Sequence, residues 1–230
     1  MVGLAEALFA KKSVGLCGGA AFGGLAALTT VIVPANIQPF FPILPFLKFD
    51  PAELFSVFAF LIFGPVAGVI AAIAHWIFLT ATGTNGPLGP AAKYASVLST
   101  LFGLWLGGKI YQRLSTKNQR MMALGSMLTF AAFVRIAIML VVNYFIFTYV
   151  GPVIFGFDYL GFSQRALQLT LGIQYAGPWL LIALLLYTSI FNGLHVAFSV
   201  VIPYMIFTPL SSRVPQIASG QPWISRFMDH

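Results

Sequence analysis

The chain has 230 residues, of which 59% are hydrophobic and 7% are charged, and its mean hydropathy is +0.92. A soluble domain carries about 25% charged residues, so the composition excludes an ordinary soluble domain and predicts an integral membrane protein. The chain has a formal charge of +7. In a membrane protein an excess of Lys and Arg usually marks the cytoplasmic loops, so the charge does not call for a nucleic-acid partner. The single cysteine, Cys17, excludes an internal disulfide framework and a cysteine-cluster metal site.

The apolar stretches are continuous rather than alternating, which favours membrane helices over a transmembrane barrel. At about 20 residues for each span, the chain has room for about six helices in one membrane domain. We therefore predict an all-α membrane protein with spans at 13–33, 51–63, 65–82, 91–111, 121–149 and 175–208. Residues 209–230 are expected to form a polar, loosely ordered cytoplasmic tail.

The first predicted span carries a stripe of small residues. Gly15, Gly19, Gly23 and Ala27 recur at every fourth position, so they share one face of the helix. Small residues let a second helix approach closely. The stripe is compatible with packing inside the chain and with docking against another subunit, and we slightly favour the partner interface.

A proline-rich segment at 34–50 follows the first span, and its prolines predict an ordered lid rather than a floppy linker. Asp50 and Pro51 then form a helix start, since Asp is a good N-cap and Pro suits the first helical position. Gly64-Pro65 ends this helix and begins the next, because proline cannot continue a helix. These signals predict a hairpin of two apolar helices with its polar mouth, residues 48–53, at one membrane face.

Basic residues near the ends of the spans predict the orientation. The turn-rich segment 83–90 and the long segment 151–174, with a short interfacial piece after Ser163, lie on the same side as the lid. With the N-terminus inside, the outer side holds three Lys or Arg residues, Lys48, Lys93 and Arg165. The inner side holds eight, namely Lys11, Lys12, Lys109, Arg113, Lys117, Arg120, Arg213 and Arg226. Both termini are therefore expected in the cytoplasm.

Several motifs occur in a fixed order: FLKFDPAEL at 46–54, FGPVAG at 63–68, TGTNGPLGPAAKY at 82–94, NYF at 143–145 and FNGLH at 191–195. In this order the chain resembles an S component of an energy-coupling-factor (ECF) vitamin transporter, and it is most similar to the riboflavin-specific type. The resemblance runs from about Phe41 to Phe207. It implies a multi-pass subunit in the plasma membrane of a prokaryote that captures the vitamin from outside. A transmembrane coupling subunit and two ATPase subunits would complete the importer, with riboflavin as cargo rather than cofactor.

The resemblance also implies a substrate site, formed by Leu47, Lys48, Lys93, Tyr94, Asn143, Asn192 and His195. The family pattern has Asn in place of Lys93 and Lys in place of His195, so a different vitamin is the alternative ligand. Asn192 and His195 are three residues apart and share a helix face, which favours a joint polar site. For Asn143 taken alone, a hydrogen bond between helices is the favoured interpretation, and Lys93 is expected to snorkel to the interface unless it points inward.

Other functional classes fit the sequence less well. An intramembrane enzyme would need a nucleophile with a base or a metal motif such as HExxH, and the sequence contains neither. A stand-alone proton-coupled carrier would place a carboxylate in the middle of a span, and all five carboxylates lie in loops or near span ends. Arg135 is the charge expected within a span, so it should face protein or a water-filled cavity.

Overall fold

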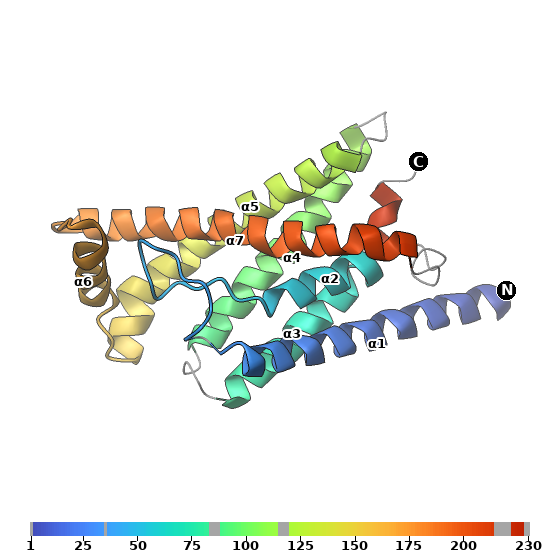
Figure 1. Ribbon diagram of the computed structural model, residues 1–230, viewed down its shortest axis with the longest axis horizontal. Helices are drawn as coiled ribbons and strands as arrows, with labels where there is room; N and C mark the ends of the chain where they lie inside the picture. The colour runs from blue at the N-terminus through green and yellow to red at the C-terminus, as the bar shows by residue number, and fades with distance from the viewer. Residues whose placement is uncertain (1, 35, 83–87, 115–119, 214–221, 228–230) are drawn as a thin grey trace.

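The computed structural model describes residues 2–34, 36–82, 88–114, 120–213 and 222–227, and within them every regular element is a helix (Figure 1). The α-helices are α1 (Val2–Ile32), α2 (Glu53–Phe63), α3 (Pro65–Thr82), α4 (Leu88–Leu114), α5 (Arg120–Phe145), α6 (Tyr159–Leu171) and α7 (Pro178–Arg213). A π-helix, η1 (Ile146–Ile154), continues α5, and a 3-10 helix, η2 (Trp223–Phe227), follows α7.

Among the described residues, four helical stretches are long and apolar enough to cross a membrane, at Ser13–Ile32, Pro65–Thr82, Met121–Ile154 and Pro178–Leu210. This confirms the all-helical prediction and indicates a membrane protein. The apolar helix α2 has only 11 residues, and six of them are buried. Length and composition thus identify four spanning helices and one shorter apolar helix among the described residues, and the count of six spans stays a prediction.

The connecting segments gather at two ends of the helix bundle (Figure 1). One end carries both chain termini, the turn between α2 and α3, and the facing ends of α4 and α5. The other end carries segment 33–52, η1 and α6, so the lid and segment 151–174 share an end, as predicted. Positions 83–87 and 115–119 of the predicted loops lie outside the described residues. The assignment of the first end to the cytoplasm stays a prediction from charge.

Two glycines of the small-residue stripe pack α1 against α3. A Cβ at Gly19 would lie 2.7 Å from the carbonyl oxygen of Ala67, and one at Gly23 would lie 2.5 Å from the Cβ of Ala74. The partner-interface prediction is therefore wrong for Gly19 and Gly23, because α3 of the same chain covers them. Gly15 differs, since a Cβ there would meet nothing within 4 Å.

The predicted hairpin is present, with one correction at its start. Gly64 has φ of +99°, a conformation that suits glycine, and α3 begins directly after it at Pro65. α2, in contrast, begins at Glu53 rather than Pro51. The reason is a turn before the helix, in which the Oδ1 atom of Asp50 accepts a 2.8 Å hydrogen bond from the N–H of Ala52.

The described parts of the predicted polar tail are more structured than expected, and so is the segment before the first predicted span. α1 begins at Val2, so the residues ahead of the first span are helical, and α7 continues to Arg213. In η2, the side chain of Ile224 is fully buried and the ring of Trp223 meets Phe60 edge-on at 4.6 Å. The prediction of a loose polar tail is wrong here because these two apolar side chains fill space at the end of α2.

An apolar core joins segment 33–52 to η1, α6 and α7. Its buried members include Phe41, Leu44, Phe147, Leu167 and Phe191. The hydroxyl of Thr170 on α6 also donates a 3.0 Å hydrogen bond to the carbonyl oxygen of Ile43. Segment 33–52 is therefore fixed by packing on three other elements, which agrees with the prediction of an ordered lid.

Candidate ligand-binding site

A cavity of about 820 Å³ lies between segment 33–52 and the helices around it, and residues of α1 to α7 contribute to its lining. Ligand pockets commonly enclose about 300–1,000 Å³, so the cavity can hold a small molecule. Five aromatic residues contribute to its wall, and they are Phe46, Phe157, Tyr159, Phe162 and Phe191. Such a wall suits a flat ring system.

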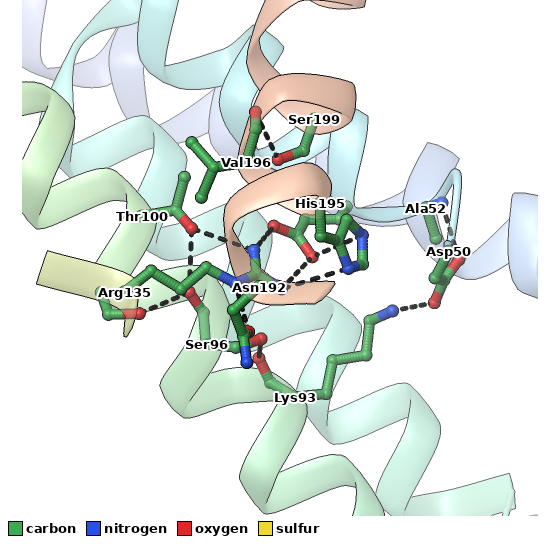
Figure 2. Close-up of polar contacts among 12 residues, drawn as sticks. Asp50, Ala52, Lys93, Ser96, Thr100, Arg135, Asn192, His195, Val196 and Ser199 are labelled. Atoms are coloured by element: carbon green, nitrogen blue, oxygen red, sulfur yellow. Dashed lines mark hydrogen bonds and ion pairs between the residues drawn. The ribbon is translucent and has the colours of Figure 1, made fainter. Parts of the chain in front are cut away.

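A buried polar cluster forms one part of this lining, and we call it the floor. It consists of Glu53 from α2, Thr100 from α4, Arg135 from α5, and Asn192 and His195 from α7. All of these except Thr100 line the cavity. Figure 2 shows Arg135 reaching between Thr100, Asn192 and His195. Four helices therefore meet at one guanidinium group.

Every N–H group of Arg135 has an acceptor in the floor. Nε donates to Oδ1 of Asn192 at 2.9 Å. Nη1 donates to Glu53 and to the hydroxyl of Thr100, the latter at 3.0 Å, while Nη2 donates to Glu53 at 3.4 Å and to Nδ1 of His195 at 3.2 Å. A guanidinium has five N–H donors, so all five are in use.

The floor carries no net charge in this arrangement. Arginine can only donate, so the Nδ1 atom of His195 must accept, and the neutral ring then carries its proton on Nε2. Nε2 lies 3.3 Å from Oε2 of Glu53 without forming an aligned hydrogen bond. The positive charge of Arg135 is balanced by Glu53, and their side chains are 2% and 0% exposed. The expectation that Arg135 faces protein or a cavity is confirmed.

A second ion pair, the rim pair, joins Lys93 of α4 to Asp50 of segment 33–52 (Figure 2). Burial alone would raise the pKa of Asp50, but the Lys93 ammonium and the N–H of Ala52 outweigh it and hold the pKa below 3.8. Snorkelling is therefore not the role of Lys93. The rim pair ties segment 33–52 to the beginning of α4.

Most of the predicted ligand residues share this one cavity. Six of them line it, and they are Leu47, Lys48, Lys93, Asn143, Asn192 and His195. Tyr94 does not accompany them, because its ring stacks on Trp76 at 5.2 Å. Residues from motifs that are far apart in the sequence thus line one cavity, although they lie on four different elements.

The two asparagines have roles opposite to those the sequence favours. The amide of Asn192 is committed at both ends, since Oδ1 accepts from Arg135 and Nδ2 donates to the carbonyl oxygen of Thr188 at 2.8 Å. Asn143 lines the cavity, and its amide makes no hydrogen bond among the described residues. The helix–helix interpretation therefore applies to Asn192, and Asn143 is the amide that a ligand can use.

Sequence reasoning missed Glu53 and Thr100. Glu53 was attributed to a polar helix start at the membrane face, but it is fully buried and bound to Arg135. A signal was present, because an arginine inside a span needs a counter-charge and the chain has five carboxylates in all. Thr100 gave no such signal, since its hydroxyl looks like any other in a helix.

Comparison with known proteins does not identify the site. No protein-family model matches the chain, and neither a curated protein nor a solved structure matches it. The described residues contain no group of three or more His, Cys, Asp or Glu side chains suited to hold a metal ion.

Proposed function

We propose that the chain is the substrate-capture subunit, or S component, of an ECF-type vitamin importer, with riboflavin as its ligand. One observation carries the proposal. Six of the seven residues that the family resemblance implies as ligand contacts line a single cavity of about 820 Å³. These residues come from distant parts of the sequence, so a shared cavity is not a trivial outcome of the motifs.

The chemistry of the cavity suits the proposed ligand. Riboflavin is an uncharged molecule with a flat ring system, a polar pyrimidine edge and a ribityl chain. The aromatic walls offer stacking surfaces, and the amide of Asn143 offers both a donor and an acceptor for a polar edge. Release to the inside would require a transmembrane coupling subunit and two ATPase subunits in the plasma membrane of a prokaryote.

The absorption spectrum of the chain purified in detergent tests the proposal directly. Retained flavin gives visible absorption, and added riboflavin should lose its fluorescence on binding. Asn143→Leu should weaken binding about tenfold to a hundredfold, since one buried hydrogen bond is lost. A colourless protein that also fails to bind added riboflavin would overturn the riboflavin assignment and direct the search to another vitamin.

Capture from outside also requires the end that holds the cavity to face outward. In a Cys17→Ser background, cysteines placed at Asn36 or Asp158 should react with a membrane-impermeant reagent in intact cells. A cysteine at Leu114, which is 80% exposed at the opposite end, should react only after permeabilisation. Labelling of Leu114→Cys in intact cells would invert the proposed orientation.

One observation favours a second candidate, a stand-alone proton-coupled carrier. The sequence argument against it was that no carboxylate lies within a span, yet Glu53 is fully buried beside Arg135 of α5. Transport assays in proteoliposomes that contain only this chain distinguish a stand-alone carrier from an S component. Ligand accumulation driven by an imposed pH gradient identifies a carrier, whereas an S component accumulates ligand only with its coupling subunit and ATPases.

A further inference from the structure

The positive charge in the floor belongs to Arg135, and a ligand can bind it only by displacing a side chain that Arg135 already contacts. All five N–H donors of Arg135 are taken, and two of them go to the same carboxylate, that of Glu53. A carboxylate or phosphate entering the cavity would have to displace Glu53 from the guanidinium. It would also meet the negative charge of Glu53 itself inside a buried site, where repulsion is poorly screened.

We propose that Glu53 is a specificity-determining residue that masks Arg135, so that the floor accepts an uncharged hydrogen-bonding group and excludes anionic ones. The ligand's identity rests on the proposed function, but the masking itself does not. Groups that suit such a floor are the amide-like or hydroxyl groups of a neutral ligand. Removal of the Glu53 charge should turn the same floor into a site for an anion.

Further contacts keep Glu53 in this role. The Nε and Nη1 atoms of Arg135 are also held by Asn192 and Thr100, so the guanidinium cannot turn away from the cavity when Glu53 is changed. The ring of His195 lies edge-on to Phe49 and Phe191, at 5.5 and 5.2 Å, which holds it against the same carboxylate. A neutral side chain at position 53 would therefore leave a positioned, unpaired guanidinium at the floor.

The first experiment measures ligand charge preference. Riboflavin is compared with two anionic flavins, riboflavin 5′-phosphate and a flavin that carries a carboxylate on its benzenoid ring, because their charges lie at opposite ends. The wild-type chain should bind at least one of the anionic flavins about tenfold or more weakly than riboflavin. Equal affinity for all three would overturn the proposal without any variant.

Variants at position 53 sharpen this comparison. Glu53→Gln keeps the size of the side chain but removes its charge, so the excluded anionic flavin should gain at least about tenfold relative to riboflavin. Glu53→Asp keeps the charge and should preserve the wild-type preference. A purely structural role would weaken all ligands alike, so an unchanged affinity ratio in Glu53→Gln would contradict the assignment.

The second experiment needs no flavin and remains decisive if the proposed function fails. Glu53→Ala leaves space for a small carboxylate beside Arg135, and formate should raise its thermal unfolding midpoint more than it raises that of the wild type. Formamide has a similar size and no charge, so it serves as the matched control. Equal effects of formate and formamide would show that the guanidinium is not an unmasked anion site.

Discussion

The cavity contains two ion pairs of the same chemistry in different surroundings. At the floor, the side chains of Glu53 and Arg135 are 0% and 2% exposed, whereas at the rim those of Asp50 and Lys93 are 9% and 19% exposed. A buried charge that loses its partner is left uncompensated, while a charge near water can be rehydrated. The floor pair is therefore the costlier of the two to break, and the rim pair is the cheaper one.

Breaking the floor should give the largest effect. Arg135→Met leaves Glu53 as an unpaired buried charge, and we expect the free energy of unfolding to fall by about 3–5 kcal/mol. Chemical or thermal unfolding in detergent measures this loss. The double variant Glu53→Leu with Arg135→Met removes both charges and should recover much of it. A double variant less stable than Arg135→Met would show that the pair is not the reason for the loss.

Substitutions of the two asparagines should affect different properties, namely the stability of the chain at Asn192 and ligand affinity at Asn143. Asn192→Leu removes the acceptor of the Arg135 Nε–H, so stability should fall by about 1–3 kcal/mol. Asn143→Leu removes an amide without a partner in the described residues, so stability should stay near the wild-type value while ligand affinity falls. Unfolding and ligand titration of both variants test this difference. Equal stability of the two would contradict the assignment of Asn192 to the floor.

Breaking the rim should be milder. Asp50→Asn removes the charged partner of Lys93, and because this pair is less buried than the floor pair we expect a loss smaller than the loss of about 3–5 kcal/mol expected at the floor. The functional readout is access to the cavity. A cysteine in place of Met139, which lines the cavity and is 6% exposed, should react faster with a thiol reagent in the Asp50→Asn background. An unchanged rate would show that the rim pair does not hold segment 33–52 closed.

Acid should weaken the rim pair, and this should be the smallest effect. The folded chain lowers the pKa of Asp50 below 3.8, so ionised Asp50 stabilises the fold above that value. The contribution is lost as the pH falls from 3.8 through the lower folded pKa. The difference in unfolding midpoint between wild type and Asp50→Asn should therefore shrink over this acidic range. A difference that stays constant there would contradict the link to Asp50.

Local signals made much of the fold predictable. The α2–α3 hairpin follows from Gly64-Pro65, where a positive φ and a proline act within two residues. The start of α2 was missed by two positions, because Asp50 stabilises a turn rather than the helix itself. The stripe on α1 gave the correct packing face, but periodicity identifies a face without saying which helix covers it. Packing against α3 decided that point.

The candidate site was only partly accessible to sequence reasoning. The predicted ligand residues came from sequence motifs, and six of them do share the cavity. The pairing of Glu53 with Arg135 spans 82 positions along the chain, and no local pattern reports a contact of that kind. A residue at a helix start was taken for a surface residue, because the sequence does not show that segment 33–52 places this helix start inside the bundle.

The shared guanidinium of the floor has a consequence for how such a chain can evolve. Four side chains meet the five donors of Arg135, so replacement of any one of them leaves a donor unsatisfied. A single substitution at one of these positions should therefore cost stability, and the positions are expected to covary. In descendants of a common ancestor, a neutral residue at position 135 should occur with a neutral residue at position 53. The exception is a lineage that changes its cargo from a neutral to an acidic compound, because there the cargo itself would occupy the donors of Arg135 that a replacement of Glu53 leaves unsatisfied.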